Sequence, residues 1–213
     1  MKLEIYKELV QGSPEWHKAR RGVITGTRLA SVMGTPRVQE TLTIELLGEI
    51  ISDVDENETT GKSYAMEYGN VAEDFVKSEY FDKLITEVGF VKKYEWLGLS
   101  PDWLIEENGE IIGAVEIKSP QVKSYVRYVL AGGIPEEYYW QVIQYFVVID
   151  SLQYLEFVIF NAQIKDKAFR HRKIVVTREE LAEDIQKVKD QLAKFKANFD
   201  TKKKELLTAF LWN

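Results

Sequence analysis

The spacing of hydrophobic residues changes along this chain from a helical period to short runs that are typical of strands. Ser13-Pro14-Glu15 has the pattern of an N-cap, a proline at the first helical position and an early acid. Between Leu42 and Ile51 the apolar residues form one stripe of a helix. We therefore predict helices that begin at Pro14, cover 26–33, include 42–51 and run from residue 63 or 64 to about 84.

From residue 86 onward the chain is rich in β-forming residues, in the runs 86–96, 97–99, 103–106 and 111–118. The segment 107–110, Glu-Asn-Gly-Glu, is typical of a hairpin turn, so the runs on either side of it should pair. The remaining predicted elements are a short helix after Pro120, an apolar helix over 136–149, strands over 154–161 and 170–176, and an amphipathic helix over 178–210.

This order of elements predicts an α/β protein whose central mixed β-sheet is flanked by helices. No internal repeat and no linker marks a boundary, so we expect a single domain over 1–213. Its parts are a helical N-terminal part (1–85), a sheet with a crossing helix (86–176) and a C-terminal helix (177–213). At 213 residues, 45% of them hydrophobic, the chain is long enough to bury a core of this kind.

The composition excludes several kinds of site. The chain has no cysteine, which removes disulfides, thiolate zinc sites, iron–sulfur clusters and cysteine nucleophiles. No apolar run approaches transmembrane length, and the N-terminus lacks the apolar stretch of a signal peptide. We therefore expect a cytoplasmic protein with no membrane partner.

The formal net charge of −6 counts mildly against a nucleic-acid partner. Local charge, however, decides which surface meets phosphate, and the positive charges are unevenly distributed. They form two clusters: Lys18, Arg20, Arg21 and Arg28 near the N-terminus, and Lys165, Lys167, Arg170, Arg172 and Lys173 beside the last predicted strand.

Two carboxylates and one amine are predicted to meet on neighbouring strands, at Asp102, Glu116 and Lys118. Residues two apart point to the same face of a strand, so Glu116 and Lys118 project together, and the hairpin brings Asp102 beside them. Taken singly, an Asp next to a proline is a common turn residue and a Glu-x-Lys is a common solvated face. Together they fit Mg²⁺-dependent phosphodiester cleavage, in which carboxylates hold the metal and the lysine places or deprotonates a water. Mn²⁺ suits the same oxygen ligands.

Three further polar side chains could extend this site. Glu73 follows Gly69 on the predicted helix over 63–84, where a small residue allows close approach to the sheet, but it could equally be a surface glutamate. Gln141 and Tyr145 lie one turn apart on the apolar helix and share a face. Gln141 would either bond a loop carbonyl or orient a water or phosphate beside Lys118.

Arg20, Arg21 and Thr27 lie in a segment that combines guanidinium groups with the start of a predicted helix. Guanidinium forks and free helix N–H groups both match phosphate oxygens. The alternative is a packing motif of two helices with Trp16 in the core. Neither histidine has a partner at ligand spacing, so a histidine-based metal site is not expected.

Taken together, these segments resemble the phage lambda exonuclease/YqaJ-type recombination nucleases, a branch of the PD-(D/E)XK superfamily. The motifs occur in order between Trp16 and about Asp150: Trp-His-Lys-x-Arg with Gly-Val-Ile-Thr, Gly-x-x-x-Glu, Ser-Pro-Asp, Glu-Ile-Lys and Gln-x-x-x-Tyr. The resemblance implies a PD-(D/E)XK nuclease core and a Mg²⁺-dependent 5′→3′ exonuclease. Such an enzyme digests one strand of linear double-stranded DNA and leaves a 3′ single strand for homologous recombination.

The resemblance also implies partners and roles for individual residues. Expected partners are DNA ends with a 5′-phosphate, two metal ions, two further copies of the chain in a homotrimeric ring and a single-strand annealing protein, in a phage or prophage within a bacterial host. The metal ligands would be Asp102, Glu116, the backbone carbonyl of Ile117, and Glu73. Lys118 would act on the attacking water with support from Gln141. DNA contacts would come from Arg20 at the 5′-phosphate, the hydroxyls of Thr27 and Ser100, and Arg21 and Tyr145.

Other functions remain open from the sequence. An endonuclease of restriction or repair type uses the same core and would cut sealed circular DNA. A non-catalytic DNA-end-binding recombination adaptor could keep the fold, although the complete acid–acid–lysine set argues against it. A structural α/β protein with a coincidental motif is disfavoured by the ordered matches, and Cas4-like relatives are disfavoured because their cluster-binding cysteines are absent.

Overall fold

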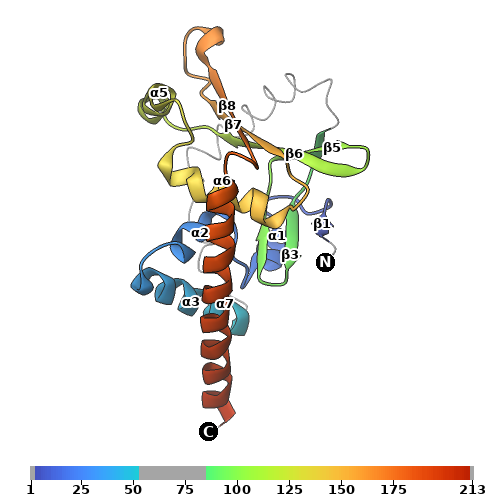
Figure 1. Cartoon of the computed structure of the whole chain (residues 1–213), viewed down its shortest axis with the longest axis vertical. Coiled ribbons are helices and arrows are strands. Elements are labelled where there is room, and N and C mark those ends of the chain that lie inside the picture. The colour runs from blue at the N-terminus through green and yellow to red at the C-terminus, as the bar shows by residue number, and fades with distance from the viewer. Residues whose placement is uncertain (1–2, 53–84, 212–213) are drawn as a thin grey trace.

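The computed structural model describes residues 3–52 and 85–211 of the chain (Figure 1). Its N-terminal part contains the short strand β1 (Glu4–Tyr6) and the helices α1 (Pro14–Arg20), α2 (Gly26–Val32) and α3 (Pro36–Ile51). The strands β2 (Ile85–Glu87), β3 (Phe90–Tyr94), β4 (Leu97–Leu99), β5 (Trp103–Glu107) and β6 (Glu110–Lys118) follow. The remaining elements are α5 (Val122–Ala131), α6 (Glu136–Val148), β7 (Tyr154–Phe160), the 3₁₀ turn η2 (Lys167–Phe169), β8 (His171–Thr177) and α7 (Ala182–Leu211).

Five strands form the main sheet, in the order β2-β5-β6-β7-β8. The pair β6 and β7 is parallel, and the other pairs are antiparallel, so the sheet is mixed as predicted. A parallel pair requires a crossover connection, which α5 and α6 provide. The strand that carries Glu116 and Lys118 is therefore the central strand of this sheet.

The turn between β5 and β6 is a two-residue hairpin loop. Asn108 and Gly109 both have positive φ, 52° and 82°, as a type I′ turn requires. Pairing starts at Glu107 with Glu110 and continues, across one register shift, to Trp103 with Val115. The hairpin predicted from the sequence is confirmed.

Alternate side chains of the sheet face two different apolar clusters. Ala114, Leu155 and Phe157 face the larger cluster, which includes α6 and α7, whereas Val115 and Val158 belong to a smaller cluster on the opposite face. Glu116 shares the face of Ala114, so its carboxylate lies on the side covered by α6. Figure 1 shows α6 beneath the sheet and α7 leading away from it toward the C-terminus.

The long C-terminal helix packs through one stripe of residues. Its buried positions recur at intervals of three and four, as a helix packed on one face requires: Ile185, Val188, Leu192, Phe195 and Phe199. The helix begins at Ala182 instead of Arg178 as predicted. Arg178 is used differently, because its guanidinium donates to the carbonyls of Phe146 and Ile149 at the end of α6, at 3.0 and 2.7 Å.

Two details of the N-terminal half differ from the predictions. The run 86–96 is divided between β2 and β3, which belong to different sheets, because β3 pairs with β1 and β4 in a second, three-stranded sheet. A Cβ at Gly89, between β2 and β3, would lie 1.8 Å from the carbonyl oxygen of Leu9, so the chain can cross there only as glycine. The strand β1 was not predicted, and the helix expected over 63–84 lies outside the described residues.

None of the helices within 3–52 and 85–211 is both long and apolar enough to cross a bilayer.

Candidate active site

Asp102 and Glu116 are brought together by the register of the β5–β6 hairpin. Trp103 pairs with Val115, so the next residues outward, Asp102 and Glu116, lie opposite each other at the end of the sheet. The position of Asp102 is fixed by a hydrogen bond from the backbone N–H of Ile117 to its Oδ2, at 2.6 Å. The sequence expectation that these two carboxylates meet is therefore matched by the geometry.

Glu116 is a buried carboxylate with three side-chain donors. Only 2% of the residue is exposed, and burying a charge is costly unless it is paired and hydrogen-bonded. Lys118 Nζ and Gln141 Nε2 both donate to Oε1, the latter at 2.6 Å, and the hydroxyl of Tyr145 donates to Oε2. Both carboxylate oxygens are thus held from β6 and from α6.

Lys118 lies between the two carboxylates and the aromatic start of α6. Burial alone favours the neutral amine, but the charges of Glu116 and Asp102 outweigh it and raise the pKa of Lys118 above its ordinary value. The ammonium group lies 5.2 Å from the ring centroid of Tyr138. About a quarter of the side chain, 24%, is exposed, so Lys118 faces both the buried acid and the solvent.

Gln141 is positioned by close contact with α2. A Cβ at Gly26, the first residue of α2, would lie 2.8 Å from Cγ of Gln141. The absence of a side chain at Gly26 therefore leaves room for Gln141 to reach Glu116. In the structure the amide of Gln141 donates to the acid itself.

Tyr145 lies in a different place from the DNA contact expected from the sequence. It is 1% exposed, and its hydroxyl is directed at Glu116 inside the protein. Burial, followed by the charges of Glu116 and Asp102, raises the pKa of Tyr145 well above its ordinary value, so the phenol remains a donor. The helical spacing of Gln141 and Tyr145 indicated a shared face, but their common target, Glu116, could be identified only in three dimensions.

A second group of predicted residues gathers around Trp16. The indole Nε1 lies 3.0 Å from both the carbonyl of Gly89 and the hydroxyl oxygen of Ser100. The guanidinium of Arg20 lies 3.7 Å from the centroid of a Trp16 ring, as a cation–π contact, and is 3.5 Å from the hydroxyl of Thr25. In the alternative interpretation of this segment, Trp16 would lie in the core. It is instead partly exposed and connects Arg20 with Ser100.

These residues border a pocket of about 380 Å³, which we call the basic pocket, lined by Trp16, His17, Arg20, Arg21, Thr25, Thr27, Arg28, Glu45 and Glu49. Arg28 is paired with Glu49, whose Oε2 also accepts a hydrogen bond from the backbone N–H of Gly22 at 2.8 Å. Thr27 is an exposed residue at the start of α2, beside Gly26. Arg20, Arg21 and Thr27 therefore share one pocket.

The donor set at Asp102 and Glu116 suits a hard divalent cation. Two carboxylates and one ammonium leave an excess of negative charge, and carboxylate and carbonyl oxygens are the ligands such ions prefer. Among the described residues, no group of three or more His, Cys, Asp or Glu side chains gathers at one point. Glu73, the third carboxylate expected from the sequence, lies outside the described residues.

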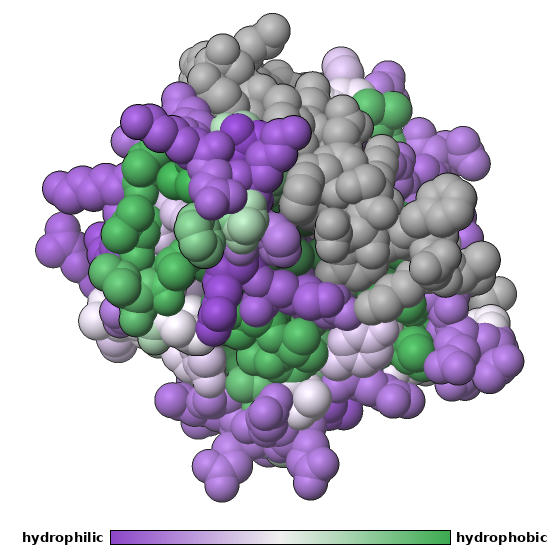
Figure 2. All heavy atoms as spheres, turned by 90° about the horizontal axis from the view of Figure 1, so that it is seen from above, coloured by the Kyte–Doolittle hydropathy of each residue, from purple (hydrophilic) through white to green (hydrophobic). Residues whose placement is uncertain are grey.

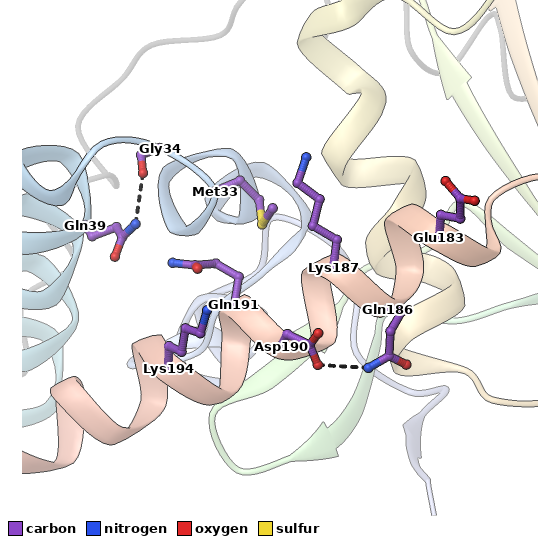
Figure 3. Close-up of a pocket in the computed structure, with 9 residues that line it drawn as sticks. All are labelled: Met33, Gly34, Gln39, Glu183, Gln186, Lys187, Asp190, Gln191 and Lys194. Carbon is purple, nitrogen blue, oxygen red and sulfur yellow. Dashed lines mark hydrogen bonds between the residues drawn. The ribbon is translucent and has the colours of Figure 1, made fainter.

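A larger groove, of about 630 Å³, lies between the turn from α2 to α3 and the first half of α7 (Figure 3). Its charged side chains are of both signs and come from α7: Glu183, Lys187, Asp190 and Lys194. Polar groups here pair with one another, since Gln186 donates to Asp190 and Gln39 to the carbonyl of Gly34. None of its lining residues belongs to the group of Asp102, Glu116 and Lys118, which we call the acid–lysine cluster.

One protein family and several solved structures are similar to this chain. Residues 15–151 match the model of the YqaJ-like viral recombinase domain. No match is found among curated protein sequences.

Among solved structures, the chain is similar to an alkaline exonuclease (LHK-Exo) from Laribacter hongkongensis, with 23% identity, a TM-score of 0.71 and coverage of 92% of this chain and 100% of that one. A structure of LHK-Exo in complex with dAMP matches with the same TM-score and coverage at 22% identity. A phage-related exonuclease from Haemophilus somnus 129PT matches at 14% identity and a TM-score of 0.60, over 86% of this chain and 96% of that one. These likenesses show the fold, a mixed sheet with flanking helices.

Proposed function

Because this chain belongs to the YqaJ-like viral recombinase domain family, we propose that it is a deoxyribonuclease that digests one strand of linear double-stranded DNA from its 5′ end. The observation that carries the proposal is the cluster of Asp102, Glu116 and Lys118 at the end of the central strand, with Gln141 and Tyr145 holding the buried acid. A buried ionised cluster of this kind is costly to a folded protein, and perturbed ionisable groups gather at functional sites.

The proposed cofactor is Mg²⁺, in two ions, with Mn²⁺ as an alternative. Asp102, Glu116 and the backbone carbonyl of Ile117 would hold it, together with Glu73. When bound, divalent cations neutralise the charge that develops on the scissile phosphate and on the leaving oxygen. The hydrogen bonds to Glu116 and Asp102 keep these carboxylates in place before substrate arrives.

Lys118 is the group that would act on the attacking water. Its side chain is partly exposed and lies beside both carboxylates, whose charges favour the ammonium form, so it can hold a water against the substrate phosphate. Gln141 supports this arrangement through Glu116, since its amide donates to the same carboxylate oxygen as Lys118.

The basic pocket would recognise the DNA end. A guanidinium fork matches phosphate oxygens, and Arg20 is held in place by the ring of Trp16. Ser100 is tied to the same indole and precedes Asp102 by two residues, so a 5′-phosphate bound near Arg20 would place the terminal strand beside the carboxylates. Thr27 and Arg21 supply further polar contacts from the pocket wall.

The wider setting is proposed on the same family grounds. The product, a 3′ single strand, would be passed to a single-strand annealing protein during phage-type homologous recombination. A homotrimeric ring would keep the enzyme on its substrate, because tethering raises the local concentration of DNA at each site without extra affinity. The setting would be the cytoplasm of a bacterium that carries the phage or prophage.

Two other functions use the same fold. An endonuclease of restriction or repair type would share the acid–lysine cluster, but the basic pocket, whose Trp16 bonds to Ser100, favours recognition of an end. A DNA-end-binding adaptor without catalysis would have no need for Lys118 to be held at Glu116.

The test is digestion of linear duplex DNA, labelled at one strand end at a time, by the wild-type chain and by Lys118→Ala with Mg²⁺. We expect ordered loss from the 5′ end and a fall of roughly 10²- to 10⁴-fold in rate for the variant, the usual contribution of a proton-transfer group. Lys204→Ala, which removes an exposed lysine of α7, is the matched control and should digest DNA like the wild type.

Cleavage of sealed circular DNA in the same assay would identify an endonuclease. Binding of DNA ends without any Mg²⁺-dependent cleavage would identify the adaptor. Equal rates for the wild type and Lys118→Ala would remove Lys118 from the proposed site.

A further inference from the structure

The second group of positive charges in the sequence lies around β8 and comprises Lys165, Lys167, Arg170, Arg172 and Lys173. It belongs neither to the acid–lysine cluster nor to the basic pocket. The structure places part of it next to an exposed apolar stripe. In α5, Val122, Val126 and Leu130 recur every four residues and face outward, exposed by 39%, 47% and 81%. Such a stripe is costly in water unless it meets another surface. Figure 2, which views this end of the molecule from above, shows an apolar patch at its left side, bordered by hydrophilic side chains.

The loop between β7 and β8 lies against α5 and adds an aromatic side chain. The hydroxyl of Tyr125, on the buried side of α5, donates to the carbonyl of Phe169 in η2. The ring of Phe169 is not buried by this contact, since the residue is 67% exposed. One face of α5 therefore holds the loop in place while the adjoining stripe and Phe169 remain in water.

Positive charges border this apolar area. Lys123 follows Val122 on α5, and Lys165 and Lys167 lie in the loop that carries Phe169; all three are exposed. We define the α5–loop surface as the apolar residues Val122, Val126, Leu130 and Phe169 with the lysines Lys123, Lys165 and Lys167. Its charge is opposite to the net charge of −6 of the whole chain.

A short segment of chain joins the α5–loop surface to the proposed active site. Lys118 is followed directly by Ser119 and Pro120, and both are held to the end of β7: Ser119 Oγ donates to the carbonyl of Phe160 at 3.3 Å, and Asn161 Nδ2 to that of Pro120 at 2.8 Å. The backbone N–H of Asn161 also donates to the carbonyl of Arg170, at 2.8 Å, at the end of the loop. α5 is the first helix after Lys118, so a strand of DNA that left the acid–lysine cluster along this side would meet α5.

We propose that the α5–loop surface binds unpaired DNA, the strand that remains when its complement is digested. The inference rests on the proposed function, which separates the two strands at the site. A duplex presents phosphates and sugars outward and keeps its bases inside, so apolar side chains gain little from it. Unpaired bases stack on aromatic and apolar side chains while neighbouring lysines bind the phosphates, which is the composition of this surface.

Binding of single-stranded DNA without divalent cations tests this proposal apart from catalysis. The probe is a fluorescein-labelled oligothymidylate of about 20 nucleotides, longer than the site size of most single-strand-binding folds. Its anisotropy is followed with the full chain in EDTA. We expect the double variant Phe169→Ala/Leu130→Ser to bind at least about tenfold more weakly, the effect of losing one stacked base.

A double lysine variant tests the contribution of charge to this binding, and a distant phenylalanine variant serves as the control. Lys165→Ala/Lys167→Ala should lower the slope of log affinity against log salt by about 1.4, since each phosphate contact with a single strand contributes about 0.7. Phe210→Ala removes a phenylalanine of similar exposure, 60%, at the far end of α7 and should bind like the wild type. The same preparations are assayed for digestion of linear duplex with Mg²⁺ and for mass by light scattering.

The outcomes are distinguishable. If the wild type digests duplex DNA but the affinity for oligothymidylate is the same in all variants, the proposal is overturned while the proposed function stands. If Phe169→Ala/Leu130→Ser changes the mass of the particle and leaves the oligothymidylate affinity intact, the surface joins copies of the chain and the proposal is likewise overturned. Weakened binding with unchanged mass supports it, even where the wild type digests nothing and the proposed function fails.

Discussion

The hydroxyl of Tyr145 donates a hydrogen bond to the buried carboxylate of Glu116, across the contact between α6 and the central strand β6. Both residues are almost wholly removed from solvent, with 1% and 2% exposed. Inside a protein such a bond is electrostatically strong, and a buried acid that loses it is left under-solvated. Tyr145 is therefore a positioning residue for the acid–lysine cluster.

Tyr145→Phe should lower both stability and affinity for divalent cations. We expect a loss of about 1.5–3 kcal/mol in the free energy of unfolding, the range for hydrogen bonds to charged groups. Affinity for Mg²⁺ or Mn²⁺ should fall by about 10- to 100-fold, the usual effect of removing a side chain that hydrogen-bonds to a metal-ligating residue. Urea denaturation and calorimetric titration with Mn²⁺ measure the two effects.

Tyr94→Phe is the matched control, because Tyr94 stacks on Trp96 at 5.4 Å, away from Glu116. It should leave the Mn²⁺ affinity unchanged. Equal Mn²⁺ affinity in Tyr145→Phe and the wild type would show that Tyr145 does not position a ligand.

Gly26→Ala should reduce activity through Gln141 with little cost in stability. The new Cβ would lie 2.8 Å from Cγ of Gln141 and displace its amide from Glu116. We expect a fall of about tenfold or more in the rate of duplex digestion, by the same positioning effect. The thermal midpoint should change little, because the advantage of alanine over glycine within a helix, about 0.5–1 kcal/mol, offsets the cost of displacing Gln141.

Gly48→Ala provides the comparison. Gly48 lies in α3, and in the part of the chain that the structure describes nothing outside its own helix backbone and chain neighbours lies within 4 Å of the position its Cβ would take. This variant should digest DNA at the wild-type rate. A Gly26→Ala enzyme with full activity would mean that the contact with Gln141 has no part in the reaction.

Arg20→Lys should weaken the preference for a 5′-phosphate. Lysine keeps the positive charge but loses the planar fork that binds two phosphate oxygens and stacks on the ring of Trp16. We expect the ratio of rates on 5′-phosphorylated and 5′-hydroxyl duplexes to fall by about tenfold. Lys18→Ala, at an exposed position of the same helix, should leave that ratio unchanged.

Stability should fall between about pH 10 and pH 12 through Tyr139. Burial, followed by its hydrogen bond to Asp184 in α7, raises the pKa of Tyr139 from 10.0 to about 12. The folded state therefore holds the proton of Tyr139 more tightly than the unfolded state does. The resulting contribution of Tyr139 to the free energy of unfolding is complete below pH 10 and is lost as the pH rises through 12. Between pH 9 and pH 11.5, the free energy of unfolding measured in urea should fall less in Tyr139→Phe than in the wild type. Equal falls in the two proteins would contradict this assignment.

The local features of the site could be predicted from the sequence. Glu107-Asn108-Gly109-Glu110 defines a hairpin by its turn chemistry, and alternation along β6 then places Glu116 and Lys118 on one face. Asp102 follows from the register that the turn imposes. These relations involve fewer than about twenty residues of chain, so backbone geometry alone determines them.

Contacts between distant segments could not be predicted in this way. The indole of Trp16 meets Ser100 across 84 positions of sequence, and Tyr145 meets Glu116 across 29. The division of 86–96 between two sheets likewise depends on the unpredicted strand β1 and on the close approach of Leu9 to Gly89.

The sequence by itself determined the family, the order of elements and the acid–lysine cluster, because each follows from motifs or from short-range periodicity. Only the tertiary structure decided that Tyr145 points inward to Glu116 instead of outward to DNA, and that Phe169 lies beside the stripe of α5. Which face of a helix is buried depends on the elements that pack against it. Those elements lie far away along the chain, and folding alone brings them together.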